Sequence, residues 1–431
     1  MQKTPSFLCT IRRLLASLVA RDDLLAMARR LRALKRLRVI HPADLVMALV
    51  GSCHGDEERS IASARRLHAR LTGTSVEEGA FYERFTPGLV AMMRELFTTA
   101  LQNAAPLQRD DLVRAVSHAG LKDILGVDAS QVSLPAAAAA QFPSTDPELG
   151  GIKLTATLSV LLQRVAKVTI TDARTHDRKA FKLDRWLHGM LLLFDRGYCD
   201  HKLFADIEDR GGFFVTRFKT SIPTLVAIRS GLGQAHVGRR LDDALPYRGE
   251  LDVDASFRVP GQDARVFRVV RIRAETVDRN GKPEIVDVWL VTNLKSEHFS
   301  AEQVAVLYRL RWSIEKLFHV LKSVARLDQL RSANPNVIHA FVYAALLGIL
   351  VSQNVCAAMR ADKPGCAPSG HRVAILVVSW LQDIARAAND VERLEACLAA
   401  FIRALWREGR NPNPGRPYMV EDYIDLLDHS A

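Results

Sequence analysis

A short, continuously apolar run at residues 191–194 is followed directly by a charged residue. Leu191, Leu192, Leu193 and Phe194 precede Asp195. A strand that is apolar on both sides is typical of the centre of a sheet whose two faces are covered. We therefore expect an α/β fold around this strand.

The neighbouring runs predict the rest of that fold. Residues 124–127 form a short apolar run that ends at Asp128, residues 152–160 alternate between apolar and polar, and residues 165–170 follow after a short break. A helical stretch closed by Gly211 and Gly212 precedes another strand at residues 213–218. The resulting order is three strands, a helix, a strand, a helix and a strand.

About eighty residues then separate this last strand from the next helical pattern, and their own pattern is β. Residues 251–259 alternate, residues 266–272 form a second run, and Asn280-Gly281 is a strong hairpin turn leading into residues 285–293. A structureless loop of this length is improbable inside a compact domain. We predict an all-β insertion.

Helical patterns dominate both ends of the chain. Residues 60–71 and 76–85 read as two helices, the second behind a Ser cap, joined by a Gly-containing turn. This is compatible with a helix-turn-helix DNA reader, although an ordinary helical hairpin is more common. The Arg- and Lys-rich run at residues 29–38 favours phosphate contacts, or forms a solvated basic face. Beyond residue 335 the chain reads as helical to about residue 405.

The charge balance points to a polyanionic partner. The 431 residues carry a formal net charge of +11, so nucleic acid is the first candidate and an anionic membrane surface the second. The longest apolar stretch, residues 337–351, is interrupted by His339 and predicts a buried core helix rather than a membrane span. No secretory signal is visible, and six cysteines without C-x2-C spacing suggest reduced thiols. We expect a cytoplasmic protein that does not associate with a membrane.

The helical pattern at residues 306–324 carries an unusual polar set. Tyr308, Arg311, Glu315 and Lys322 lie within roughly 60° of one another on a continuous helix. The opposite side is apolar, so the helix can dock on a core. One carboxylate among a phenol and two cations can hold a metal ion while its neighbours bind phosphates. The polar outer face of any docked helix is the plain alternative.

Three acids stand out by their position. Asp128 and Asp195 each follow a predicted core strand, and carboxyl ends of adjacent strands converge at one edge of a sheet. With Glu315 they form a set of oxygen ligands that suits Mg²⁺ or Mn²⁺. Two such ions, roughly 3.5–4 Å apart, support phosphoryl transfer on a nucleic-acid backbone. A single Asp after a strand is more often a turn or cap residue, which is the alternative for Asp128 taken alone.

Five segments carry a resemblance to a known family, and they cover about residues 120–330. They are Asp128-Ala129-Ser130, residues 192–198 (LLFDRGY), residues 214–217 (FVTR), residues 290–294 (LVTNL) and residues 307–318 (LYRLRWSIEKLF) with Lys322. The chain resembles the bacterial DDE transposases of insertion sequences that carry the Y-R-E-K signature. Ala129 is a mild departure, because the family usually has Gly or Ser there.

The resemblance implies a fold and a set of roles. The fold is a ribonuclease-H-like core, a mixed five-stranded sheet with flanking helices, interrupted by the β insertion. Asp128, Asp195 and Glu315 would hold two Mg²⁺ ions, for which Mn²⁺ can substitute. DNA contacts would come from Tyr308, Arg311, Lys322 and, next to the second acid, Arg196. Trp289 lies in the right strand to stack on a flipped base, although a packed aromatic is the commoner role and its register is open.

These observations predict a domain order and a function. We expect a helical DNA-binding domain at residues 1–118, the catalytic core at 119–219 and 303–332, the insertion at 220–302 and a helical region at 333–431. The predicted function is cut-and-paste DNA transposition by a homodimer that acts on terminal inverted repeats and target DNA in the nucleoid. The alternatives are an inactive transposase-derived DNA-binding protein and a related nuclease that cuts without joining.

Overall fold

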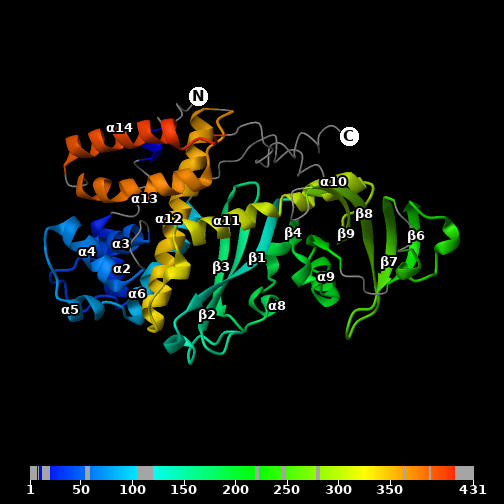
Figure 1. The fold of residues 1–431 in the computed structure, drawn as a ribbon, viewed down its shortest axis with the longest axis horizontal. Coiled ribbons are helices and arrows are strands. Elements are labelled where there is room, and N and C mark those ends of the chain that lie inside the picture. The colour runs from blue at the N-terminus through cyan, green and yellow to red at the C-terminus, as the bar shows by residue number, and fades with distance from the viewer. Residues whose placement is uncertain are drawn as a thin grey trace.

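The fold is built on one mixed sheet with helices on both faces and a helical bundle at one end (Figure 1). It was obtained as a computed structural model, which describes residues 20–53, 59–103, 120–218, 223–244, 249–277, 282–363, 365–387 and 390–412, together with residues 7 and 9–11. The sheet has nine strands in the order β3-β2-β1-β4-β5-β9-β8-β7-β6.

The first five strands of the chain lie next to one another. They are β1 (Asp123–Leu134), β2 (Gly150–Ser159), β3 (Arg164–Asp172), β4 (Met190–Phe194) and β5 (Phe213–Arg217). β1, β2 and β3 pair antiparallel, whereas β4 pairs parallel with both β1 and β5. The apolar run at residues 191–194 is therefore a central strand, and all four of its residues are buried as predicted.

The remaining strands extend the same sheet. They are β6 (Thr224–Ser230), β7 (Leu251–Phe257), β8 (Arg265–Val277) and β9 (Pro283–Thr292). We expected a five-stranded sheet and a separate β insertion, but β9 pairs antiparallel with β5, so the edge of the core sheet continues into these strands. β6 was not predicted, and the Asn280-Gly281 turn lies outside the described residues.

Helices cover both faces of the sheet where its strands are most apolar. α9 (His201–Glu208) packs on one face, through Leu203, Phe204 and Ile207 against β4, β5, β7 and β8. α10 (Ala301–Arg309) packs on the opposite face, where Val304 and Leu307 join the apolar residues of β4, β5, β8 and β9. A one-turn helix, α8 (Asp177–Ala180), follows β3.

The helices from the two ends of the chain form a single bundle (Figure 1). From the N-terminal part come α2 (Arg21–Arg30), α3 (Pro42–Ser52), α4 (Ile61–Thr72), α5 (Glu78–Tyr82) and α6 (Pro87–Asn103). From the C-terminal part come α12 (Pro335–Asp362), α13 (Gly370–Ala387) and α14 (Val391–Glu408). α12 is long and apolar enough to cross a membrane, yet 83% of its most apolar window is buried in this bundle, as expected of a core helix.

The two N-terminal helices that suggested a DNA reader are present. Ser60 caps α4, and Gly73 ends it in the left-handed region with a φ of 70°. α5 begins at Glu78 rather than at residue 76, and no side chain caps its start. Our prediction of a Ser-capped helix at 76–85 was therefore wrong in its start and its cap.

The predicted continuous helix at residues 306–324 is two helices. α10 ends at Arg309 and α11 (Trp312–Ser323) follows. Between them the backbone tightens, because the N–H groups of Leu310, Arg311 and Ser313 each bond to the carbonyl three residues earlier. A 3₁₀-like turn inside a helical run breaks the regular 100° rotation. The single polar stripe that we expected is therefore interrupted after Tyr308.

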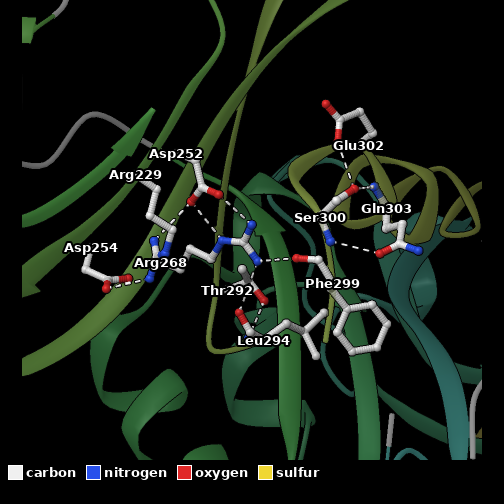
Figure 2. Close-up of polar contacts among 10 residues, drawn as sticks. All are labelled: Arg229, Asp252, Asp254, Arg268, Thr292, Leu294, Phe299, Ser300, Glu302 and Gln303. Carbon is white, nitrogen blue, oxygen red and sulfur yellow. Dashed lines mark hydrogen bonds and ion pairs between the residues drawn. The ribbon is translucent and has the colours of Figure 1, made fainter. Parts of the chain in front are cut away.

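A buried ion-pair cluster joins the outer strands to the start of α10 (Figure 2). Arg268 on β8 is 3% exposed and donates to both carboxylate oxygens of Asp252 on β7, at 2.8 and 2.6 Å. Its third nitrogen donates to the carbonyl of Phe299 at 2.7 Å, directly before Ser300, which caps α10. Arg229 on β6 completes the cluster by pairing with Asp252 and Asp254.

Candidate active site

Asp128 and Asp195 lie side by side at the end of the parallel pairing between β1 and β4. The last pair in that register is Val127 with Phe194, so each acid is the next residue on its strand. Neighbouring strands are about 4.8 Å apart. Asp195 follows the end of β4 as predicted. Asp128 does not end its strand, because β1 continues to Leu134 through its pairing with β2.

The pleat of β1 turns Asp128 toward the face covered by α10 and α11. Ile124 packs in the core beneath α10, and residues at even spacing from it lie on the same face. Gly126 lies on that face too, and a Cβ placed on it would be 3.5 Å from the Cβ of Ile314 on α11. Since Ile314 directly precedes Glu315, this crossing of α11 over β1 brings Glu315 near Asp128.

The electrostatics of Asp128 reflect this gathering of acids. The pKa of the Asp128 carboxyl is raised to about 6, chiefly by burial and also by the charges of Asp195 and Glu315, against the lowering effects of Arg311 and of a hydrogen bond from the Ala129 N–H. That N–H donates to Asp128 Oδ1 at 2.8 Å. The Gly197 N–H donates to Asp195 Oδ1, also at 2.8 Å. Each Asp is thus held by the backbone through one oxygen.

Glu315 is paired within its own helical segment. Arg311 Nη2 lies 2.6 Å from Glu315 Oε1, and the Arg311 side chain is 12% exposed. Burial lowers the pKa of Arg311, but Tyr308, Glu315 and Asp128 outweigh it and raise the pKa. The guanidinium is therefore a buried cation placed among the acids.

Tyr308 belongs to the core more than to the surface. Its ring is 9% exposed and packs beneath α10, with the Arg311 guanidinium 5.6 Å from the ring centroid. Burial raises the pKa of its hydroxyl, while Arg311 and Arg217 lower it. We expected Tyr308 on an open polar stripe, which was wrong because the turn at Leu310 and Arg311 separates it from α11.

The other predicted DNA contacts fall into two groups. Lys322 in the last turn of α11 and Arg196 directly after Asp195 are both exposed on the surface. Trp289 on β9 lies on the opposite face of the sheet, with the apolar residues that pack against α9. There its direct cross-strand partner Arg271 places a guanidinium 4.8 Å from the ring centroid. Its role as a base stacker stays a prediction.

The donor chemistry of the three acids suits a hard divalent cation. Carboxylate oxygens are the ligands that Mg²⁺ and Mn²⁺ prefer, and the pKa of Asp128 is raised first by burial and then by the charges of Asp195 and Glu315. Within the residues that the structure describes, no three His, Cys, Asp or Glu side chains are close enough to hold a metal ion as they stand. In this arrangement Glu315 contacts Arg311.

Three further side chains at this site were given no role from sequence. Tyr198 is buried, and its hydroxyl has no hydrogen-bond partner among the described residues. Burial raises the pKa of this hydroxyl, and the charges of Asp177, Asp128 and Asp195 raise it further. The charge of Arg217 on β5 lowers the pKa of the Tyr308 hydroxyl. Trp312, next to Arg311, is 62% exposed, which is unusual for so large an apolar side chain. All three lie in segments that carried the family resemblance, so their position there was the available signal.

Comparisons with known proteins agree with this geometry. The family model described as a transposase DDE domain matches residues 119–351, more than half of the chain. The transposase of insertion sequence element IS421 from Escherichia coli is 40% identical over 98 residues, which are 23% of this chain and 24% of that protein. The transposase of IS231F from Bacillus thuringiensis subsp. israelensis is 23% identical over 442 residues, 93% of this chain and 92% of its own.

The comparison with solved structures adds a weak likeness. A piggyBac transposase synaptic complex with hairpin DNA has a TM-score of 0.40 and 11% identity, covering 99% of this chain and 86% of that chain. A likeness at this level supports no argument about fold or mechanism. The extent of the family match is decisive by itself, and it includes all three acids. The chain belongs to the family of proteins with a transposase DDE domain.

Proposed function

We propose that this protein is a DNA transposase that excises an insertion sequence and joins it to new DNA. The observation that carries the proposal is the placement of Asp128 and Asp195 side by side on two paired strands, near the helix that bears Glu315, inside a chain of the DDE family. The basic net charge of +11 suits a protein that binds DNA.

The proposed domain order follows the earlier expectation. β1 to β5 with α10 and α11 would form the ribonuclease-H-like core at residues 119–219 and 303–332. β6 to β9 would be the insertion at residues 220–302, attached to the edge of the core. The N-terminal helices of residues 1–118 would read DNA, and the helices of residues 333–431 would support them.

The catalytic chemistry would depend on divalent ions. Asp128, Asp195 and Glu315 would hold two Mg²⁺ ions, or Mn²⁺ in their place, which lower the pKa of an attacking water or 3′-hydroxyl and stabilise the leaving oxygen. For this, Glu315 would exchange its contact with Arg311 for a metal contact. Arg311 would then be free to pair with a phosphate, which offers the bidentate geometry that a guanidinium favours.

The remaining residues would position the DNA. Lys322 and Arg196 are exposed cations, one in the last turn of the helix that bears Glu315 and one directly after Asp195, and they suit contacts with phosphates. Tyr308 is buried, so we assign it to the support of Arg311 more than to DNA itself. Trp289 would reach a base only if Arg271 moved off its ring.

The partners follow from the reaction. The substrates would be the terminal inverted repeats and a target duplex, and two copies of the chain would hold paired ends in the nucleoid of the cytoplasm. A nuclease that cuts without joining is the rival enzyme, and an inactive DNA-binding descendant is the rival non-enzyme. A strand-transfer assay with pre-cut ends separates the first rival, and metal-dependent nicking excludes the second.

Glu315→Gln is the sharpest test. It removes one metal-binding charge from an exposed part of α11, so strand transfer should fall by several orders of magnitude while binding to the ends stays within a few-fold. Glu302→Gln, an exposed acid on α10, is the matched control and should keep full activity. Strand transfer by purified Glu315→Gln at the wild-type rate would contradict the assignment.

A further inference from the structure

A cavity of about 450 Å³ opens beside the Glu315 helix and away from the three acids. It lies between α11, α12 and the start of α13. Its floor is apolar and includes Leu317, Ile349 and Ala374. A volume of this size falls within the usual range of ligand pockets and exceeds what a single water or small ion would fill.

The rim of this cavity is cationic. Lys316 and His319 come from α11, Arg360 from α12 and His371 from the first turn of α13. None of the described side chains that line the cavity is acidic. The start of an 18-residue helix adds partial positive charge from its backbone N–H groups. The rim therefore favours an anion.

Two details of the rim suit an anion. The Nε of Arg360 is buried and has no hydrogen-bond partner among the described residues, although buried polar atoms are normally paired. The rings of His319 and His371 stack with centroids 5.8 Å apart. Burial lowers the pKa of His371, and the charges of His319 and Arg372 lower it further.

The position of the cavity relates it to the proposed reaction. Lys316 and His319 are one and four residues after Glu315 on α11, so they lie only about 1.5 and 6 Å further along the helix axis. Successive phosphates of one DNA strand are about 3.4 Å apart along the duplex axis. A strand held at the acids would thus reach the cavity within a few nucleotides.

We propose that this cavity binds one nucleotide unit of the DNA backbone, with the phosphate at the Lys316, His319, Arg360 and His371 rim and the sugar against the apolar floor. This inference rests on the proposed function, because it assigns a subsite for the same DNA. The mixed lining matches a nucleotide unit, which has a charged phosphate and a largely apolar sugar face. The contact is independent of base sequence.

The test is the salt dependence of DNA binding by the full chain. A short fluorescein-labelled duplex of arbitrary sequence serves as the probe, measured by anisotropy at several salt concentrations. Each lost phosphate contact lowers the log–log slope of the binding constant against salt by about 0.9. Arg360→Gln and Lys316→Gln should each lower the slope by up to that amount, because both cations neutralise the same phosphate. Lys316 is exposed, so its variant stays informative if Arg360→Gln folds poorly.

Two comparisons separate the possible outcomes. Arg372→Gln removes an exposed cation next to His371 that does not line the cavity, and it should leave the slope unchanged. Lys322→Gln removes a proposed contact outside the cavity and should lower the slope. A normal slope in both cavity variants beside a reduced slope in Lys322→Gln overturns the cavity assignment and leaves the proposed function intact. Absence of DNA binding by the wild type overturns the proposed function itself.

A second measurement locates the anion. Histidine resonances of the full chain, followed by NMR against pH, should show the pKa of His371 rising when the duplex is added, because a nearby phosphate favours the charged ring. Inorganic pyrophosphate is the comparison probe. A rise with pyrophosphate but none with the duplex would mean that the cavity takes a free phosphate anion, which would overturn the assignment to DNA.

Discussion

The two aspartates are neighbours because the parallel pairing of β1 and β4 stops one residue before each of them. Asp128 is the more perturbed, because burial and two nearby acids raise its pKa to about 6. Each of these effects disfavours a negative charge, so the charged form of Asp128 destabilises the folded protein until a cation binds. This loss of stability comes from one side chain and can be tested by changing that side chain.

Asp128→Asn should stabilise the metal-free protein at neutral pH. The folded pKa of Asp128 lies above its usual value of 3.8, so the folded state binds the proton more tightly and loses stability as pH rises through the window from about 4 to 6. Removing the charge recovers up to about 3 kcal/mol, at about 1.4 kcal/mol per pKa unit.

Thermal unfolding in EDTA at pH 7.5 and pH 4 measures this effect. The melting temperature of Asp128→Asn should exceed that of the wild type at pH 7.5, and the difference should shrink toward pH 4. Strand transfer by the same variant should be lost. A variant less stable than the wild type at pH 7.5 would show that the charge of Asp128 is already compensated in the folded state.

At the scale of elements, the start of α10 is fixed by the outer strands. Arg268 connects Asp252 on β7 with the Phe299 carbonyl, one residue before the cap of α10 (Figure 2). α10 continues through a tight turn into α11, which carries Glu315. The position of Glu315 on α11 therefore depends partly on β7 and β8, which belong to the outer part of the sheet.

Arg268→Met should destabilise the fold by about 3–5 kcal/mol, because it leaves Asp252 buried with only Arg229 as a partner. The double variant with Asp252→Leu should lose much less than the sum of the two single losses, since it removes both buried charges. Arg273→Gln on the same strand removes only an exposed pair with Asp287 and should cost less than about 1 kcal/mol.

Urea unfolding of the wild type, the two single variants, the double variant and Arg273→Gln measures these differences. Strand transfer by Arg268→Met at temperatures well below its melting point should also fall, because the start of α10 is released. Additive losses in the double variant would mean that the two charges stabilise the fold independently, and the proposed link to α10 would then fail.

The elements that sequence predicted well are those with a strong local pattern. The strands at residues 191–194 and 213–218 and the helices beyond residue 335 follow directly from apolar runs and periodicity. The turn at Leu310 and Arg311 was missed, because both residues are good helix formers and the local sequence gives no sign of a break. β6 was missed because its residues alternate only weakly.

At the scale of the whole molecule, sequence could not predict how the parts join. The pairing of β9 with β5 turns two predicted sheets into one, and it depends on contacts far apart in the chain. Trp289 and Asp128 lie on opposite faces of the sheet, and this placement depends on the register of the strand pairings. By contrast, the three acids were proposed from local signals, namely an apolar run before each aspartate and the helical motif around Glu315, and their role as metal ligands stays a prediction.

The joining of distant parts is also what assembles the site. α12 runs through the bundle formed by both ends of the chain, and the buried Arg59 ties that bundle to the segment directly after α11 by donating to the Ala325 carbonyl at 3.0 Å. The sheet carries Asp128 and Asp195, whereas α11 carries Glu315 and borders both the sheet and the bundle. The proposed function therefore requires the three carboxylates to act as one ligand set.

Mn²⁺ binding to the full chain, followed by electron paramagnetic resonance, tests that requirement most directly. We expect saturable binding by the wild type and by Glu302→Gln, and a loss of at least tenfold in affinity in each of Asp128→Asn, Asp195→Asn and Glu315→Gln. Wild-type Mn²⁺ affinity in all three site variants would contradict it.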